Sequence, residues 1–272
     1  MSASPSRPQS LVIPGLTRSD HGEPSIFLPE NLLRDARRQR GLAEGRVPAI
    51  CVLDPDLDIV RYVRRRQRAR ESPTWPCYHT DLWETDWRGR DLGIIGGAVG
   101  ASFAVLLAEQ LFVSGCELLI SVTSAGQIAN HLTLPATILI DRALRGEGTS
   151  HAYLPNEASV EADPGQITAA AGGLADRNIS FVQGMTWTTD APFRETPSAL
   201  AAAAAAGALA VEMEAAALYA FARARQRPVV CVAIVTNQMA QRAGDFDKGP
   251  EDGAEHALAV VSAIAAGHHT PR

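Results

Sequence analysis

Short apolar runs alternate along the chain with longer stretches whose residues favour helices. The runs have the length and the content of Val, Ile and Leu that are typical of buried strands. They cover residues 47–53, 91–96, 117–123, 179–185 and 228–236. The helical stretches cover residues 102–113, 196–206, 214–225 and 251–266. Strand, helix and strand in this order predict βαβ units, and therefore an α/β domain whose sheet is at least partly parallel.

Two Asp-Pro pairs predict helix starts, because Asp is a good N-cap and Pro suits the first helical position. These pairs lie at 54–55 and 163–164. Residues 1–24 are rich in Ser, Pro and Gly, and we expect a disordered tail there, ahead of a single domain at 25–272. The uncharged stretch 92–108 is shorter than a membrane span and contains glycines, so we expect a strand, a turn and a helix instead.

Composition narrows the class of protein. The 272 residues are 46% hydrophobic and 20% charged, which excludes a wholly disordered chain. A net charge of −5 argues against nucleic acid as the partner. The four cysteines form no CxxC pair and the seven histidines show no metal-ligand spacing. We therefore expect reduced thiols, a cytoplasmic location, no metal and no membrane association.

Polar residues follow several predicted strands, and in α/β sheets ligands bind just beyond the carboxyl ends of the strands. These residues are Asp54, the glycines at 96–100, residues 121–126, 188–190 and 212–214, and Asn237. Each group also has a structural explanation, such as a tight glycine turn or acids that favour the positive end of a helix. The small residues 124–126 are expected to form a loop that caps the next element or holds an anion. The residues alone predict an α/β enzyme with a small-molecule site.

An arginine-rich segment extends from Arg61 to Arg70 at the end of the first βα unit. A solvated helix end explains it, because cations are favoured near the C-terminus of a helix. The alternative is an anion site that a neighbouring subunit completes.

Four segments, in order along the chain, carry a resemblance to a known family. They are GGAVGASFAVLLAEQL (96–111), SVTSAGQI (121–128), VEMEAAALYAFA (211–222) and IVTNQM (234–239). Together they resemble the nucleoside phosphorylase and uridine phosphorylase superfamily. The resemblance implies a three-layer α/β/α sandwich around a mixed, partly barrel-like sheet. It also implies a homo-oligomer (dimer, trimer or hexamer) that cleaves the N-glycosidic bond of a purine or pyrimidine nucleoside with phosphate, giving free base and ribose 1-phosphate.

The resemblance implies roles for individual residues as well. Glu214 and Asn237 would be catalytic: Glu214 would accept hydrogen bonds from the ribose hydroxyls, and Asn237 would stabilise the leaving base. Phosphate would be the co-substrate, with no further cofactor. The other implied site residues are Met213 and Glu212 at the ribose, Trp187 and Thr123 at the base, and Ser124, Gly126 and Arg61 at the phosphate.

Asn237 also bears on the choice of base. Many purine-cleaving relatives have an Asp there, which acts as a general acid. An Asn side chain cannot give up a proton in that way, although it can donate and accept hydrogen bonds. The resemblance therefore favours a 6-oxopurine or a pyrimidine over adenine.

Two departures from the family pattern concern the nucleophile. Phosphorolytic relatives carry an Arg where this chain has Ser121, and the family motif Gly-Asp-Pro-x-Arg is altered to Leu-Asp-Pro at 53–55 with no Arg before Arg61. A phosphate dianion buried without a cation is costly. Either Arg61, Arg142 or Arg194 supplies the charge, or phosphate is not the nucleophile. A hydrolytic nucleosidase that uses water and a non-catalytic nucleoside-binding protein are the alternatives to the phosphorylase.

Overall fold

The computed structural model describes residues 21–237 and 248–268, and its central feature is a sheet that closes partly on itself. Five strands form a ring in the order β5, β10, β6, β8 and β9, and β9 pairs back with β5. The sheet is mixed, because the pairs β5–β10, β6–β8 and β8–β9 are parallel whereas the pairs β10–β6 and β9–β5 are antiparallel. These strands are β5 (Leu118–Gln127), β6 (Ala136–Gly146), β8 (Val182–Thr189), β9 (Ala210–Glu212) and β10 (Val229–Asn237).

The sheet continues outward from β5 through β1 (Ile50–Asp54), β4 (Asp91–Gly96), β3 (Trp83–Asp86) and β2 (Ala69–Glu71). The parallel pairs of β1 with β4 and β5 confirm the predicted βαβ arrangement. A further short strand, β7 (Ser159–Glu161), pairs with β6. The short strands β2, β3 and β7 have too few apolar residues to stand out in the hydrophobic pattern, and the sequence did not predict them.

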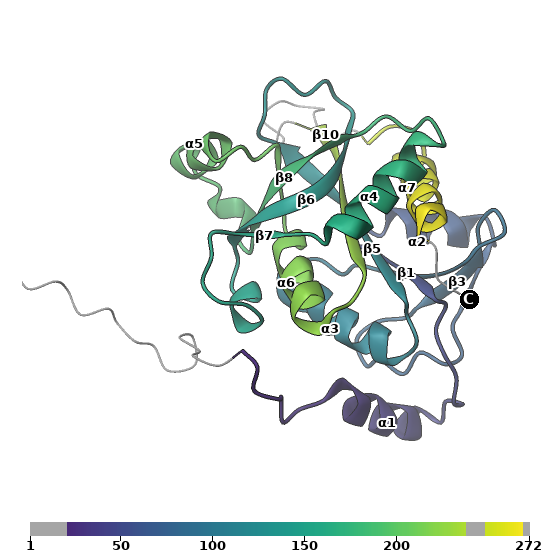
Figure 1. Ribbon diagram of the computed structural model, residues 1–272. Helices are drawn as coiled ribbons and strands as arrows, with labels where there is room; N and C mark the ends of the chain where they lie inside the picture. The colour runs from purple at the N-terminus through teal and green to yellow at the C-terminus, as the bar shows by residue number, and fades with distance from the viewer. Residues whose placement is uncertain (1–20, 238–247, 269–272) are drawn as a thin grey trace, which may run out of the picture.

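Helices cover both sides of the sheet, which confirms the three-layer α/β/α expectation. Figure 1 shows α4 and α7 lying side by side over one face, whereas α3 and α6 pack together elsewhere on the sheet. The helices are α1 (Pro29–Arg40), α2 (Asp58–Arg65), α3 (Ala101–Val113), α4 (Pro164–Ala175), α5 (Pro197–Ala205), α6 (Ala215–Arg225) and α7 (Ala254–Gly267). Short 3₁₀ turns lie at Ser150–Ala152, Pro192–Arg194 and Pro250–Gly253.

Two local predictions around β1 and β5 are wrong. Asp54 is not the N-cap residue of a helix: it is the last residue of β1, paired with Gly96, and α2 begins four residues later, although the Asp54 carboxylate reaches Val60 N in the first turn of α2. Residues 124–126 do not form a loop, because they continue β5 and pair with β10. In both places the pairing with a neighbouring strand outweighs the local preference of the residues. The other Asp-Pro prediction is confirmed, since the Asp163 carboxylate accepts a hydrogen bond from Gln166 N at 2.9 Å at the start of α4.

The uncharged stretch 92–108 divides into β4, a glycine turn and α3, as expected. Within the described ranges, no helix has the length and apolar content that a membrane span requires. Residues 1–20 of the expected tail, and Gln238 and Met239 of the fourth motif, lie outside the described residues.

Helices α4 and α7 approach each other closely through glycines. A Cβ atom added at Gly173 would lie 2.1 Å from the carbonyl oxygen of Ala263, whereas one added at the adjacent Gly172 would have nothing within 4 Å. Packing against α7 therefore requires a glycine at position 173 but not at position 172.

We expect Gly173→Ala to lower the free energy of unfolding by about 1–3 kcal/mol, because the helices must move apart. The neighbouring Gly172→Ala is the matched control and should leave stability unchanged or raise it by up to about 1 kcal/mol, since alanine favours a helix. Urea denaturation of both variants measures the difference. Equal stabilities would contradict the close approach.

Candidate active site

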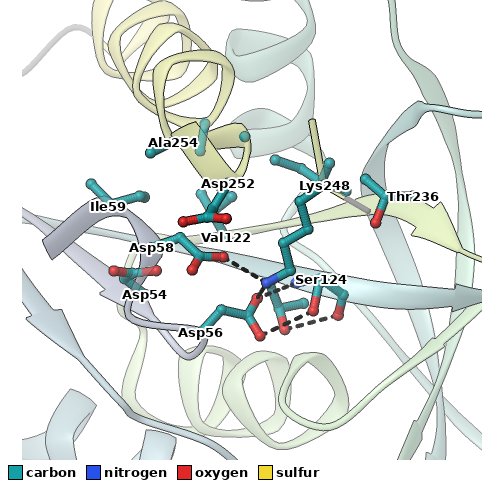
Figure 2. Close-up of a pocket in the computed structure, with 14 residues that line it drawn as sticks. Asp54, Asp56, Asp58, Ile59, Val122, Ser124, Thr236, Lys248, Asp252 and Ala254 are labelled. Carbon is teal, nitrogen blue, oxygen red and sulfur yellow. Dashed lines mark hydrogen bonds and ion pairs between the residues drawn. The ribbon is translucent and has the colours of Figure 1, made fainter. Parts of the chain in front are cut away.

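A pocket opens at the carboxyl ends of β1, β5 and β10, where the sequence predicted a site. Its wall combines apolar side chains with four aspartates, a lysine and hydroxyl groups (Figure 2). The lining residues are Asp54, Asp56, Asp58, Ile59, Val122, Thr123, Ser124, Ile234, Thr236, Lys248, Asp252, Gly253, Ala254 and Ala257.

Lys248 forms two ion pairs inside this pocket. Figure 2 shows its side chain reaching Asp56 and Asp58, and Nζ lies 2.6 Å from Asp58 Oδ2 and 3.4 Å from Asp56 Oδ2. Its side chain is only 17% exposed, so these contacts are poorly screened by water. Burial by itself lowers the pKa of Lys248, but the hydrogen bond to Asp58 and the charge of Asp56 outweigh it, and the pKa is raised. The lysine is therefore a fixed cation at neutral pH.

The carboxylate of Asp56 also accepts two hydrogen bonds from Ser124. The Ser124 backbone N–H donates to Oδ2 at 2.8 Å and its hydroxyl donates to Oδ1 at 3.0 Å. A backbone N–H and a hydroxyl aimed at the same point suit an anion. Here the anion is a carboxylate from the altered family motif. The resemblance assigns both the segment after β1 and the segment around Ser124 to phosphate. In this fold the two segments are in direct contact, because the Asp56 carboxylate accepts the hydrogen bonds of Ser124.

Asp54 is the most buried acid of the pocket, at 2% exposure. Its Oδ2 accepts a hydrogen bond from Val60 N in the first turn of α2 at 2.9 Å. Burial raises the pKa of Asp54 to about 7, and the charges of Asp56 and Asp58 act in the same direction. Asp54 is therefore partly protonated at neutral pH.

Glu214 lies next to this pocket, at the start of α6, and is 1% exposed. Its Oε1 accepts a hydrogen bond from Gly100 N at 2.7 Å, and this bond and the Thr123 side chain both act to lower the pKa of Glu214. Its Oε2 is buried without a partner among the described residues. Burial raises the pKa of Glu214 to about 8, and the charge of Glu212 adds to the effect. A buried carboxylate oxygen without a partner is suited to accept the hydroxyl of a ligand.

The glycine turn before α3 donates a backbone hydrogen bond to the Glu214 carboxylate. Gly100 has a φ of 92°, which only glycine adopts without strain, and this conformation directs its N–H at Glu214. The glycine motif found in the sequence is therefore both a tight turn and part of the site.

Glu212 holds the backbone at Glu214 in place. Its Oε2 accepts hydrogen bonds from Glu214 N and Ala215 N, both at 2.7 Å, which caps the first turn of α6. Its Oε1 accepts hydrogen bonds from the Thr186 and Thr188 hydroxyls. Burial raises the pKa of Glu212, and these four bonds oppose the rise by favouring the ionised form. With both oxygens engaged, Glu212 positions Glu214; the expected contact between Glu212 and ribose stays a prediction.

The remaining predicted residues lie at several points around the carboxyl ends of the strands. Met213 is half-buried between the two glutamates, and Asn237 is buried at the end of β10. Gly126 lies within β5 and pairs with Asn237. Trp187 in β8 lies so close to Gly146 that a Cβ there would be 2.2 Å from the indole nitrogen. Their predicted contacts with base, sugar and phosphate stay predictions.

None of the three replacement arginines lines the pocket in the part of the chain that the structure describes. The Arg61 side chain is 58% exposed and lies 3.9 Å from Asp58. Arg142 and Arg194 are exposed on β6 and on the 3₁₀ turn after β8. Ser121 is buried within β5 and supplies no cation.

Three important residues of the pocket were missed: Asp56, Asp58 and Lys248. The first two had a visible signal, because with Asp54 they form an Asp-x-Asp-x-Asp pattern directly after a predicted strand. Lys248 had none, since it meets them only in the folded chain, 190 residues away from Asp58.

Comparison with known proteins identifies the family. The model of the phosphorylase superfamily matches residues 63–266, which is most of the chain. The chain belongs to the phosphorylase superfamily. The match confirms the resemblance carried by the four motifs.

Solved structures agree with this membership at the level of the fold. Uridine phosphorylase from Vibrio fischeri ES114 superposes with a TM-score of 0.69 at 19% identity, covering 83% of this chain and 95% of that one. The same enzyme complexed with 6-hydroxy-1-naphthoic acid gives 0.69 at 18% identity, covering 84% and 97%. A search among curated proteins finds no match. Within the described residues no cluster of metal-ligating side chains occurs. The oligomeric state, the cytoplasmic location and the lack of a cofactor stay predictions.

The burial of Asp54 predicts a pH dependence of stability. Between pH 3.8, the ordinary pKa of an Asp, and about 7, the folded chain holds a proton that the unfolded chain has lost, so raising the pH through this window lowers the free energy of unfolding. Asp54→Asn keeps an oxygen for Val60 N and removes the charge. Its stability relative to the unaltered protein should rise across the window, by up to about 4 kcal/mol, and then stay constant. Urea denaturation at several pH values measures this; a difference independent of pH would contradict it.

Proposed function

We propose that the protein cleaves the N-glycosidic bond of a nucleoside and that water, rather than phosphate, attacks the sugar. Family membership supports cleavage of a nucleoside. The choice of water rests on one observation, which is that the Asp56 carboxylate occupies both hydrogen-bond donors of Ser124. Phosphorolysis, the first expectation from the resemblance, is the second candidate.

The sugar would be held by Glu214. Breaking the N-glycosidic bond places positive charge on the sugar ring, and an ionised carboxylate close to it lowers the energy of that state. The unpartnered Oε2 of Glu214 is the acceptor for a ribose hydroxyl. Hydrogen bonds donated by the sugar would also favour the ionised form of Glu214, whose pKa burial raises to about 8.

A phosphate dianion is disfavoured in the acidic pocket. It would have to displace Asp56 from Ser124 and lie near Asp54 and Asp58. The cation available among the described lining residues is Lys248, which already neutralises two carboxylates. Bringing a further anion next to like charges in a half-buried site costs free energy that no group there offsets. A neutral water molecule meets no such cost.

The hydrolytic step balances with the residues present. The oxygen of a water molecule attacks C1′ while the C1′–N bond breaks, and the base leaves with the bonding electrons. The water gives a proton to the Asp56 carboxylate, which acts as the general base. That proton then passes to solvent or to the departing base, and the products are free ribose and free base. Asn237 at the end of β10 would hydrogen-bond the base, and Trp187 would stack on it, with a 6-oxopurine or a pyrimidine as the favoured base.

The second candidate, phosphorolysis, is favoured by Lys248. If substrate binding moved Asp56 away, the lysine and the two donors of Ser124 would together bind phosphate. Product analysis separates the two candidates.

The test measures base release from inosine, guanosine, adenosine, uridine and 5′-methylthioadenosine in phosphate-free buffer and with excess phosphate. Hydrolysis predicts equal rates and free ribose in both buffers. Asp56→Asn should lower kcat about 100-fold or more without changing the dependence on phosphate, as expected for loss of a general base. Glu214→Gln is the control for the sugar site and should abolish turnover by either route.

Release that requires phosphate and yields ribose 1-phosphate would overturn the proposal in favour of phosphorolysis. Binding of a nucleoside without any release would favour the non-catalytic protein.

A further inference from the structure

The pocket is closed on one side by a backbone turn of unusual conformation. Residues 249, 251, 252 and 253 all have positive φ values, and Glu251 and Asp252, at 53° and 54°, are not glycines. Two successive residues of this kind are strained and persist only when their surroundings hold them. This turn, residues 248–253, carries Lys248 at its start.

Helix α2 holds the turn at both of the helix ends. At its first residue, Asp58 binds Lys248 Nζ at 2.6 Å. At its last turn, Arg65 and Arg66 bind the two carboxylate oxygens of Glu251 at 2.9 and 3.2 Å. The turn is therefore fixed at two points, and Lys248 lies at the end that reaches the pocket.

These contacts account for part of the arginine-rich segment. Arg66 also lies 3.6 Å from Glu255 in α7, and its guanidinium stacks over Tyr62. Arg64 lies over Trp83, and Arg70 pairs with Glu84. In the described part of the chain, the arginines at the end of α2 thus bind carboxylates and rings of their own subunit. The side chains of Arg65, Arg66 and Arg70 remain 52%, 45% and 77% exposed, which agrees with a solvated helix end, and an anion site that a neighbouring subunit completes stays a prediction.

Charged groups face Lys248 from every element packed around it. Asp54 comes from β1, Asp56 comes from the β1–α2 connection, Asp58 is the first residue of α2, and Asp252 comes from the turn. Glu214 from α6 is near enough for the Asp56 charge to raise its pKa. Without Lys248, five carboxyl groups would face one another, and like charges at this spacing favour protonation of one of them or its movement away.

We propose that Lys248 is a positioning residue for the nucleophilic water: its ion pairs keep the Asp56 carboxylate on Ser124, and the contact of Arg65 and Arg66 with Glu251 keeps Lys248 in the pocket. This inference rests on the proposed hydrolytic function, because it assigns Asp56 its role. In this proposal Lys248 acts through Asp56 and not directly on the water or the sugar. Its effect should therefore appear in kcat and in the pH profile, with little change in KM.

The test compares Lys248→Met with Lys248→Arg. The Met variant keeps the apolar stem and loses the charge, so the acid limb of the kcat profile should move to higher pH and kcat at neutral pH should fall about tenfold or more. The Arg variant restores a cation and should recover most of kcat. Glu251→Gln weakens the contact of residue 251 with Arg65 and Arg66 and keeps the lysine at position 248. It should lower kcat at neutral pH by a smaller factor than Lys248→Met does. Arg70→Met removes an exposed ion pair outside the pocket and should behave like the unaltered enzyme.

A second measurement does not depend on activity. Amide hydrogen exchange of Ser124 reports its hydrogen bond to Asp56, and exchange should be faster in Lys248→Met than in Lys248→Arg. Faster exchange together with the shifted acid limb supports the proposal. Unchanged exchange in Lys248→Met overturns it, and so does an unchanged pH profile in an enzyme that hydrolyses nucleosides. An unaltered enzyme that requires phosphate overturns the proposed function instead, whereas the exchange result still decides whether Lys248 holds Asp56.

Discussion

The contact between the Asp56 carboxylate and Ser124 determines what this site can do. Both donors of Ser124 lie at the carboxyl end of β5, held there by parallel pairing with β10, and they would bind whichever anion is nearest. The chain supplies that anion itself from the segment after β1. Asp54 and Asp58 lie close to Asp56 in the same segment of the chain. Lys248 provides the cation for this acidic segment through its ion pairs with Asp56 and Asp58. The charge of the whole pocket follows from that one contact.

The two sides of the candidate site stabilise carboxylates in different ways. On the sugar side, Glu212 is surrounded by four donors and serves the start of α6, and Glu214 has one oxygen bound by a glycine N–H and the other without a described partner. On the nucleophile side, Asp56 accepts hydrogen bonds from the backbone N–H and the hydroxyl of Ser124 and in addition forms an ion pair with Lys248. This difference gives the sugar side a rigid acceptor and the nucleophile side an acid whose contacts can be exchanged during a reaction. Both properties are useful in a step that moves a proton.

Much of the fold could be predicted from the hydrophobic pattern, because β1, β4, β5 and β10 are buried and their residues read as continuous apolar runs. The ring closure could not be, since the pairing of β9 with β5 depends on contacts far apart in the chain. The start of α2 was misplaced for a similar reason: Asp54-Pro55 favours a helix locally, yet Asp54 pairs with Gly96 in the sheet. For the site, motif resemblance found Glu214 and Ser124. It could not find Asp56, whose acid belongs to none of the four motifs, or Lys248, which reaches Asp56 only in the folded chain.

The most direct test of this account is a crystal structure of the unaltered protein grown in phosphate. The account predicts that the Asp56 carboxylate still accepts both hydrogen bonds from Ser124, with Lys248 between Asp56 and Asp58 and no phosphate on the Ser124 donors. A phosphate ion bound to the N–H and hydroxyl of Ser124, with Asp56 turned away and Lys248 on the phosphate, would contradict it.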